Sequence, residues 1–520
     1  MGEKYILILG AGLMQRPSIE SAKELGYKTL VIDANPHAVC VPFADRFEQV
    51  DLKDREAIAK LALSMKDDLA AIFTAGTDFS ASVSYAAEKC GLPSHTFQAA
   101  MNASNKVLMR RCFAEHGIPS PDFFEADEDY LAKVIDGTAD GISFPKVVKP
   151  VDNMGARGCR LVRNKDEFIP ALKEAVGYSR TKKAIVEDYM AGPEFSIDAL
   201  VCNGNVTITG FADRHIYFEP YFIELGHTMP SQCSEKMKAE LVDCFTKAVH
   251  ALGLTTGVAK GDIKYTEKGP MIGEIAGRLS GGYMSGWTFP YSSDVNLTKE
   301  AMKIALGQIP ESTGTGEIPS VKYSHERAFI SIPGKVKTIY GQDNAIASPF
   351  IKNLFFRVKE GSVVDFPRNN VEKCGNVITL SEQRELSLWG AESAVSQIVL
   401  RLEKGNKATD DYLAGMELEH EKGFPYSAYA MSAEDCSALE KELEKLPDLE
   451  EGKSAADLYR EISLRFKDLR DFNYRSIGQT LELFDSICPE HGKLETKKFW
   501  KYLLRGGIQA VLYYADSKEA

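Results

Sequence analysis

The segment FPKVVKPVDNMGARGCRLV, residues 144–162, places a glycine-containing loop between two short apolar strands. Lys149 stands at the end of the first strand, and Gly155 and Gly158 lie in the loop. The backbone N–H groups of such a loop, together with a lysine, can bind the oxygens of a triphosphate. A plain hairpin with a glycine turn fits the same pattern, so the neighbouring segments have to decide between the two interpretations.

The next segment, AIVEDYMAGPEFSIDAL at residues 184–200, is placed to form an opposite wall. One strand ends at Glu187, a short linker follows, and Glu194 begins the next strand. A linker between two subdomains can read the edge of an adenine base with its backbone, while a carboxylate accepts ribose hydroxyls. Solvated turn acids are the alternative interpretation of Glu187 and Glu194.

The segment GDIKYTEKGPMIGEIAGRLSGG, residues 261–282, predicts a β-hairpin with two acids on adjacent strands. Asp262 and Glu274 would repel each other at neutral pH unless a cation lay between them. Oxygen ligands of this kind are those that Mg²⁺ prefers. Arg278 follows, and a guanidinium there could clamp a phosphoryl group during its transfer. Exposed, salt-bridged acids are the alternative.

The N-terminal segment ILILGAGLMQ, residues 6–15, begins like a dinucleotide-binding βαβ unit. A strand runs into Gly10 and Gly12, and a second strand ends at Asp33, about where a ribose-binding acid would stand. The third glycine of that fingerprint is missing, since Gln15 follows instead. Its absence argues against a nicotinamide cofactor. Residues 1–100 alternate strands and helices, which predicts a parallel, helix-covered sheet.

Composition restricts the class of protein. The chain has 520 residues, which suggests three or four domains, and a net charge of -12, which argues against a general nucleic-acid surface. No apolar run is long enough to cross a membrane, and no signal peptide is visible. The ten cysteines form no CxxC pattern. We therefore expect a cytoplasmic protein with reduced thiols.

Taken together, the ordered motifs resemble the ATP-grasp superfamily over about residues 1–310, and more loosely over 318–405. In that family the N-terminal glycine turn belongs to a domain that binds no dinucleotide and helps to form the carboxylate-substrate site. The resemblance implies the following roles: Lys106, Lys149 and the loop with Gly155 and Gly158 bind ATP phosphates, Glu187 and the backbone near Met190 hold the adenine, Glu194 holds the ribose, and Asp262 and Glu274 bind Mg²⁺ (or Mn²⁺).

One departure from the family concerns the metal site. Many members have an asparagine two residues after the second acid, whereas this chain has Ala276. Glu224 and His227, in FIELGHTMPS at residues 222–231, resemble the Glu-x-x-His of the L-amino acid ligases. This likeness implies that Glu224 joins the metal cluster and that His227 lines the substrate site, a structural turn histidine being the alternative. Weaker pocket candidates are Asp213, Arg214 and His215, together with Gly281 and Gly282.

We expect a multidomain protein of mixed α/β and α+β class. The expected parts are a pre-ATP-grasp Rossmann-like domain (1–105), an ATP-grasp domain (106–310) whose ATP lid subdomain covers about 115–190, a β-rich C-terminal ligase domain (311–405) and an α-rich extension of unknown role (406–520). A helix is expected from Glu392. The extension is interpreted as a solvated helical cap or a dimer element.

The function that the resemblance implies is an ATP- and Mg²⁺-dependent carboxylate–amine ligase. It would form an amide, a dipeptide being one class of product, through an acylphosphate and release ADP and phosphate. Lys149, Arg278 and His227 would be its catalytic groups, and a small carboxylate and an amine its substrates, with no nucleic-acid or membrane partner and a homodimer allowed. The alternatives are a bicarbonate-using enzyme of the carboxylase or carbamoyl-phosphate synthase type, and a catalytically decayed nucleotide-binding regulator.

Overall fold

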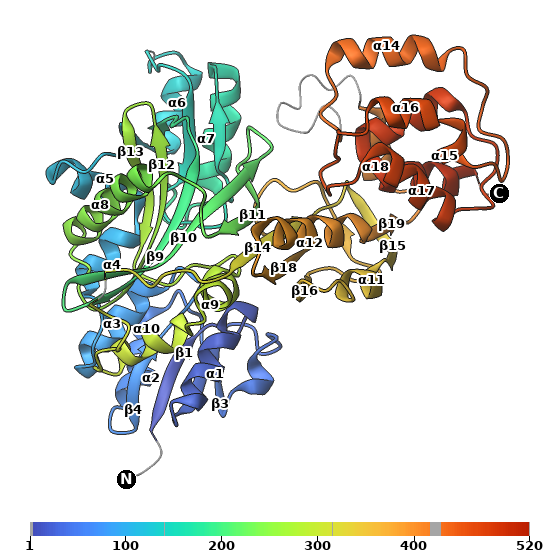
Figure 1. Ribbon diagram of the computed structural model, residues 1–520. Coiled ribbons are helices and arrows are strands. Elements are labelled where there is room, and N and C mark those ends of the chain that lie inside the picture. Colours follow the sequence, from blue (N-terminus) through green and yellow to red (C-terminus); the bar gives the residue numbers. More distant parts are fainter. Residues whose placement is uncertain (1–3, 140, 315, 416–427, 519–520) are drawn as a thin grey trace. The chain divides into compact units, whose positions relative to one another are not determined.

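The structure is a computed structural model that describes residues 4–139, 141–314, 316–415 and 428–518 (Figure 1). It divides into two compact units. Unit 1 consists of Met1–His215, His227–His325 and Leu380–Arg384, and unit 2 of Ile216–Gly226, Glu326–Thr379 and Glu385–Ala520. Each unit is described by itself below.

The N-terminal part of unit 1 is a parallel four-stranded sheet in the order β3-β2-β1-β4, as the alternating pattern predicts. Its elements are β1 (Tyr5–Leu9), α1 (Arg16–Glu24), β2 (Lys28–Asp33), β3 (Arg46–Gln49), α2 (Arg55–Ser64), β4 (Leu69–Phe73), α3 (Ser80–Cys90) and α4 (Phe97–Ser104). Strands β1, β2 and β4 are buried on both faces, which is why their sequences read as nearly continuous apolar runs.

The glycine turn after β1 is closed by the chain's own groups. Gly10 has a φ of +99°, and the Gln15 side chain hydrogen-bonds the backbone of Ala75 beside it. The Asp33 carboxylate accepts a hydrogen bond of 2.8 Å from the backbone N–H of Ala11, at the start of the turn. Asp33 is therefore engaged with its own loop, and Gln15 occupies the place beside the turn.

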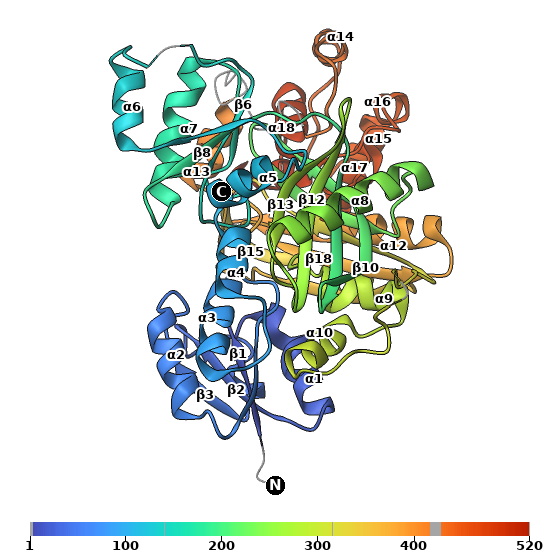
Figure 2. The same cartoon turned by 90° about the vertical axis from the view of Figure 1, so that its left-hand side faces the viewer.

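A second, antiparallel sheet forms the segment expected as the lid, in the order β5-β8-β6-β7 (Figure 2). It contains β5 (Phe123–Ala126), α6 (Glu128–Ile135), β6 (Lys146–Pro150), β7 (Arg160–Val162), α7 (Lys165–Tyr178) and β8 (Ala184–Asp188). The apolar sides of α6 and α7 pack on the sheet, with Phe168 and Leu172 fully buried. Helix α5 (Lys106–Glu115) leads into this segment.

The central sheet of unit 1 carries the two acids of the predicted hairpin. Its order is β13-β12-β9-β10-β11, and α8 packs on β12 and β13. The elements are β9 (Glu194–Cys202), β10 (Asn205–Tyr217), β11 (Ile223–Met229), α8 (Glu235–Ala251), β12 (Gly257–Thr266), β13 (Gly269–Ala276), a one-turn π-helix (Met284–Thr288), α9 (Phe289–Ser293) and α10 (Leu297–Ala305). Strands β12 and β13 form the expected hairpin, in which Asp262 lies opposite Glu274.

Unit 2 joins the expected ligase domain and the extension around one hydrophobic core. Its strands are β14 (Tyr323–Phe329), β15 (Gly334–Tyr340), β16 (Ile351–Phe356), β17 (Val363–Val364), β18 (Gly375–Ser381) and β19 (Val399–Leu402), ordered β14-β18-β16 and β17-β15-β19. Its helices are α11 (Gln342–Ile346), α12 (Arg384–Gln397), α13 (Lys407–Ala414), α14 (Ala433–Leu443), α15 (Ala455–Leu458), α16 (Arg460–Arg465), α17 (Ile477–Ile487) and α18 (Thr496–Lys518).

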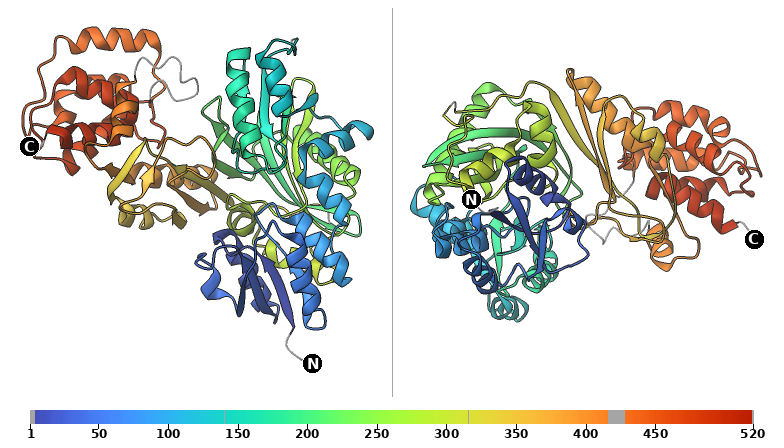
Figure 3. Two further views of the ribbon diagram at one scale, coloured as in Figure 1. Left: turned by 180° about the vertical axis from the view of Figure 1, so that it is seen from behind. Right: turned by 90° about the horizontal axis from the view of Figure 1, so that it is seen from below.

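The extension is an integral part of this core. Trp500 and Leu503 of α18 belong to the same buried cluster as Val336 and Leu400 of the β-rich segment. Figure 3 shows the red C-terminal helices gathered beside the yellow and gold strands of that unit. The interpretation as a solvated cap is therefore wrong, because the apolar side of α18 is buried against the ligase domain.

Two further expectations concern local features. Helix α12 begins at Arg384, eight residues before the predicted start at Glu392, since the serine turn at Ser381 already ends strand β18. All ten cysteines are free thiols. Among the described residues, no helix combines the length and the apolar character needed to cross a membrane.

Candidate active site

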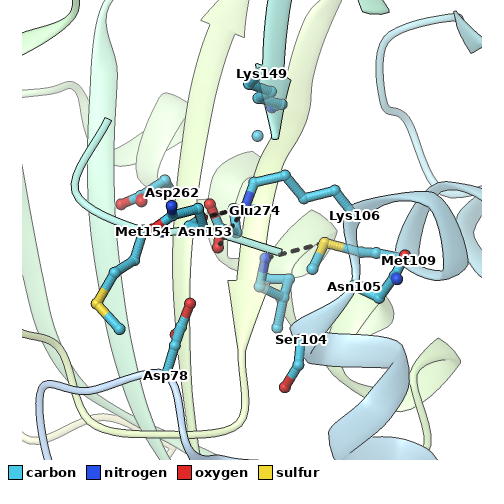
Figure 4. A network of polar contacts seen from close by, with 12 residues as sticks. Asp78, Ser104, Asn105, Lys106, Met109, Lys149, Asn153, Met154, Asp262 and Glu274 are labelled. Atoms are coloured by element: carbon cyan, nitrogen blue, oxygen red, sulfur yellow. Dashed lines mark hydrogen bonds and ion pairs between the residues drawn. The ribbon is translucent and has the colours of Figure 1, made fainter. Parts of the chain in front are cut away.

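Lys106 lies at the centre of a polar network in unit 1 (Figure 4). It begins helix α5, directly after Asn105, whose side chain caps the helix. The buried Lys106 Nζ lies 3.6 Å from Glu274 and donates a hydrogen bond of 2.9 Å to the carbonyl oxygen of Asn153. Burial alone would lower the pKa of Lys106, but Glu274 and Asp78 raise it above its usual value. The ammonium is therefore a fixed positive charge between the acids and the glycine loop.

The Glu187 carboxylate is fully enclosed and paired with two cations. Arg110 Nε lies 2.9 Å and Lys149 Nζ 2.6 Å from its oxygens. Burial would raise the pKa of Glu187, and the two cations outweigh that effect and hold it below its usual value. Glu187 thus fixes the direction of Lys149 at the end of β6. It lies inside the site, and the interpretation as a solvated turn acid is wrong.

Asp262 and Glu274 face each other across the β12–β13 hairpin, and cations surround them. Lys260 pairs with Asp262, Arg214 Nη1 lies 2.8 Å from Asp262, and Lys106 faces Glu274. Two opposed carboxylates are a suitable donor set for a hard divalent cation. The residues present therefore fit Mg²⁺, with the lysines and the arginine now balancing the same charge.

The completion of the metal site is not visible in this arrangement of side chains. Among the described residues, no three His, Cys, Asp or Glu side chains are grouped so that they could hold a metal ion. Ala276 is buried on β13 opposite Lys260, at the position where many ATP-grasp proteins carry asparagine. Lys260 therefore lies opposite Ala276, the position where the resemblance would place an asparagine side chain.

The predicted ribose and adenine residues are linked to the acid pair through Arg214. Arg214 bridges Glu194 and Asp262. Lys264 Nζ lies 3.5 Å from Glu194 and donates a hydrogen bond of 3.1 Å to the carbonyl oxygen of Met190. The structure therefore brings Met190, Glu194 and Asp262 into one connected set, although they were predicted from separate segments.

The loop of residues 277–283, named here the Arg278 loop, follows β13 and meets the N-terminal domain. Arg278 Nε donates a hydrogen bond of 2.9 Å to Asp78. Burial lowers the pKa of Arg278, but Asp78 more than offsets this effect and raises it. Gly281 lies so close to Gly76 that an added Cβ would come within 3.3 Å of the Gly76 carbonyl oxygen. The glycine thus favours the close approach of the two backbones, since a Cβ here would need a shift of a few tenths of an ångström.

The glycine loop between β6 and β7 is anchored at its start. Asp152 accepts hydrogen bonds of 2.9 to 3.0 Å from the Ser179 hydroxyl and from the backbone N–H groups of Arg180 and Thr181. Gly155 and Gly158 both adopt positive φ, and a Cβ on Gly158 would come within 2.9 Å of the Tyr178 ring. The loop is therefore held to its surroundings at Asp152 and at Asn153, whose side chain donates a hydrogen bond to the Tyr178 carbonyl oxygen.

The remaining predicted residues lie on β10 and β11. Glu224 belongs to unit 2, where its carbonyl oxygen accepts a hydrogen bond from Lys373. His227 is fully buried in unit 1. His215 hydrogen-bonds Thr228 at 2.8 Å, and Asp213 contacts Ser231 and Arg384. The roles of these residues in metal binding and substrate recognition remain predictions.

Four polar residues of the site were not predicted: Asp78, Arg110, Asp198 and Lys260. Arg110 lies four residues after Lys106, so helical spacing alone places both on one face of α5. Lys260 lies two residues before Asp262, so strand alternation places both on one face of β12. Asp78 is brought to Arg278 by the packing of a distant loop, for which the sequence carries no local signal.

Comparison with known proteins agrees with this geometry. Residues 142–286 match the model of the ATP-grasp domain, and residues 328–403 match that of L-amino acid ligase C-terminal domain 2. The chain therefore contains an ATP-grasp domain, followed by a segment that matches C-terminal domain 2 of the L-amino acid ligases. The predicted resemblance to these proteins is confirmed.

Three relatives illustrate the range of similarity. The chain is 24% identical over 408 residues to the uncharacterized protein y4rH of Sinorhizobium fredii (strain NBRC 101917 / NGR234), covering 76% of this chain and 83% of that one. It is 25% identical over 334 residues to carnosine synthase 1 of Gallus gallus, covering 59% of this chain and only 36% of that protein. The crystal structure of the L-amino acid ligase from Bacillus licheniformis superposes with a TM-score of 0.67, at 22% identity, over 78% of this chain and 100% of that one, which shows a shared fold.

Proposed function

We propose that the protein is an ADP-forming carboxylate–amine ligase that uses ATP and Mg²⁺. The observation that carries this proposal is the opposed pair Asp262 and Glu274, enclosed by Lys106, Lys260 and Arg214. Such a site offers carboxylates to a divalent cation and fixed cations to phosphate oxygens, which is what a triphosphate with its metal requires. The family and the resemblance to amide-forming ligases support the rest.

The proposed reaction has two steps. A carboxylate oxygen of the first substrate attacks the γ-phosphorus of ATP, the bond from that phosphorus to the bridging oxygen breaks, and ADP leaves. The amine of the second substrate then attacks the acyl carbon of the acylphosphate, the carbon–oxygen bond breaks, and phosphate leaves while the amine loses a proton. Mg²⁺, held by Asp262 and Glu274, would supply charge neutralisation for the phosphates.

The chain's own residues then act by position and charge. Lys106 and Lys149 would neutralise the phosphates, with Glu187 directing Lys149. Arg278 would neutralise the transferred phosphoryl group, and His227 would line the substrate site. Because an acylphosphate hydrolyses readily, we expect the loop beyond Asn153 to exclude water when the nucleotide is bound. No protein nucleophile is needed in this mechanism.

The test is ADP release from MgATP against the twenty amino acids, singly and in pairs, with bicarbonate as a separate addition. The proposal predicts release that needs one carboxylate and one amine together, and loss of that release in Glu274→Gln. Release that needs bicarbonate and no amino acid would instead indicate the carboxylase-type alternative. ATP binding without any release across the panel would indicate a decayed site, although both acids and all the surrounding cations are present.

A further inference from the structure

Asp198 is a buried acid on β9 that the proposed mechanism does not use. Its Oδ2 accepts hydrogen bonds from the Ser280 hydroxyl at 2.6 Å and from the Ser280 N–H at 3.2 Å. Its Oδ1 has no hydrogen-bond partner among the residues that the structure describes. The residue is 0% exposed and lies opposite Lys260 in the strand register. Burying a carboxylate oxygen without a hydrogen bond costs free energy, so the contact with Ser280 alone does not explain an acid at this position.

Ser280 connects Asp198 to the Arg278 loop. The serine lies two residues after Arg278, and its carbonyl oxygen accepts a hydrogen bond of 2.7 Å from Ser285. On the other side, the Gly76 N–H donates to the Leu279 carbonyl oxygen at 3.2 Å. The loop is thus fixed at consecutive residues, from the sheet through Ser280 and from the N-terminal domain through Leu279.

The backbone after this attachment is unusual. Gly282 and Tyr283 have φ values of +60° and +67°, and a π-helix follows at Met284–Thr288. A left-handed tyrosine costs conformational free energy that the surroundings have to supply. The two hydrogen bonds from Ser280 to Asp198 directly precede this strained turn, so they are placed to hold the loop in its conformation.

The Asp198 carboxylate also lies within the electrostatic influence of two cations of the candidate active site. Lys260 and Arg278 are the cations that act on it, and Lys260 in turn pairs with Asp262. Burial nevertheless raises the pKa of Asp198 to about 6. The fold therefore keeps a poorly solvated carboxylate within the field of Arg278, where an uncharged side chain would be easier to bury.

We propose that Asp198 is a positioning residue for the ligase reaction, which holds the Arg278 loop through Ser280 and so sets the direction of the Arg278 guanidinium. This inference rests on the proposed function, because Arg278 is assigned there to the transferred phosphoryl group. In the proposed mechanism, Asp198 touches neither substrate. Its effect on the rate comes through the geometry of the loop.

The first measurement is hydrogen exchange by mass spectrometry on the full chain without ligand, which does not depend on any activity. Asp198→Asn and Ser280→Ala are compared with Thr209→Val, which removes a buried hydroxyl of the neighbouring strand β10 that has no hydrogen-bond partner among the described residues. We expect amide exchange in residues 279–283 to become about tenfold faster in the first two variants and to stay unchanged in the third.

The second measurement is steady-state ADP release with the substrate pair that gives the highest rate in the screen above. We expect kcat to fall about 10- to 100-fold in both loop variants, with the KM for ATP within about twofold, because Lys106, Lys149 and Glu187 are not attached to this loop. In an Arg278→Lys background, Asp198→Asn should lower kcat by less than about threefold further, since both changes act on the same guanidinium.

The outcomes separate the two proposals. Unchanged exchange in residues 279–283, or faster exchange with a normal kcat, would overturn the role of Asp198 and leave the ligase assignment intact. Full additivity with Arg278→Lys would also overturn it. If the unaltered chain releases no ADP with any pair, the proposed function fails, and the inference about catalysis fails with it, while the exchange data still decide whether Asp198 holds the loop.

Discussion

Buried charge is organised differently in the two units. In unit 2, Arg475 is enclosed by Asp471 and by the backbone carbonyls of Ser396 and Ile398, and Asp471 also accepts the backbone N–H groups of Asn473 and Arg475, so that all these groups belong to the buried core. In unit 1, the cations and acids form one connected set in which Lys106 contacts Glu274 and the glycine loop, and Arg214 contacts both Asp262 and Glu194.

The difference indicates which unit contains charged side chains that exchange their ion-pair partners when a ligand binds. A closed pair such as Arg475 with Asp471 stabilises one arrangement and gains nothing from a ligand. A set of cations around two opposed carboxylates can pass its charge to a nucleotide and a metal, because Lys106, Arg214 and Glu187 each contact more than one partner and so link the set. We therefore interpret the charges of unit 2 as structural and those of unit 1 as functional, and the variants below test that division.

The largest expected effect is the loss of turnover when the connected set is broken. Lys149→Ala and Glu274→Gln should each lower kcat for ADP release by about 10³-fold or more, since phosphoryl transfer depends on fixed charge. The melting temperature should change little, which circular dichroism checks. Near-normal rates in either variant would contradict the functional interpretation of unit 1.

The matching change in unit 2 should act on stability alone. Arg475→Met leaves Asp471 buried without its cation, and we expect the free energy of unfolding to fall by about 3–5 kcal/mol in urea titrations. The kcat of the folded fraction should stay within about twofold. Arg460→Met, which removes an exposed pair with Asp457, is the control and should change neither quantity. A normal stability for Arg475→Met would remove the distinction between the units.

A pH experiment sharpens the comparison at Asp198. Its pKa is about 6 in the folded chain and about 3.9 when unfolded, so between these values the folded state keeps a proton that the unfolded state has released. The contribution of Asp198 to stability is thus present below pH ~4 and is lost as the pH rises to ~6, by up to ~3 kcal/mol. Lys260 and Arg278 are the cations that face it.

The measurement is urea unfolding of the unaltered chain and Asp198→Asn at pH 4.5 and pH 7. The variant should lack this loss, so it should be at least as stable as the unaltered chain at pH 7 while turning over more slowly. A variant that is clearly less stable at pH 7 would assign Asp198 to the structural group instead.

Much of the site was predictable because its residues are local to one hairpin or one loop. The register of a short hairpin can be counted from its turn, which is why Asp262 and Glu274 were expected to face each other. The parallel N-terminal sheet followed from the alternation of apolar strands and helices, whereas the lid was expected from the family resemblance. Lys149 and Gly158 could be placed from the strand–loop–strand pattern alone.

The parts that escaped prediction depend on packing between distant segments. Asp78 reaches Arg278 because Ala75 forms a bridge with Leu279, 204 positions later in the chain. Asp198 meets Ser280 only after β9 has paired with β12. The extension joins the ligase domain through the buried side of α18, which its charged, helix-like sequence did not reveal.

A smaller effect is expected at the adenine wall. Glu187→Gln removes the charge that directs Lys149 and leaves Arg110 partly unpaired. We expect the KM for ATP to rise about tenfold with a smaller change in kcat, measured with both substrates saturating. A change in kcat alone would place Glu187 nearer the chemistry than the adenine. Arg111→Gln, on the exposed side of α5, is the matched control.

The smallest expected effect concerns the metal in the absence of nucleotide. Lys106, Lys260 and Arg214 already balance the charges of Asp262 and Glu274. Adding EDTA should therefore shift the melting temperature by less than about 1 °C, although it abolishes ADP release. A loss of several degrees would show that a divalent cation is part of the folded structure, which would contradict the exchange of partners proposed for unit 1.

The proposed ligase mechanism requires that a substrate carboxylate accept the γ-phosphoryl group of ATP. The most direct measurement supplies the carboxylate substrate labelled with ¹⁸O in both oxygens and analyses the released phosphate by mass spectrometry. The acylphosphate mechanism predicts one ¹⁸O atom in each phosphate, because the carboxylate oxygen that attacks phosphorus leaves with it when the amine displaces the phosphate. Phosphate without label, released together with an amide product, would contradict the acylphosphate and with it the proposed mechanism.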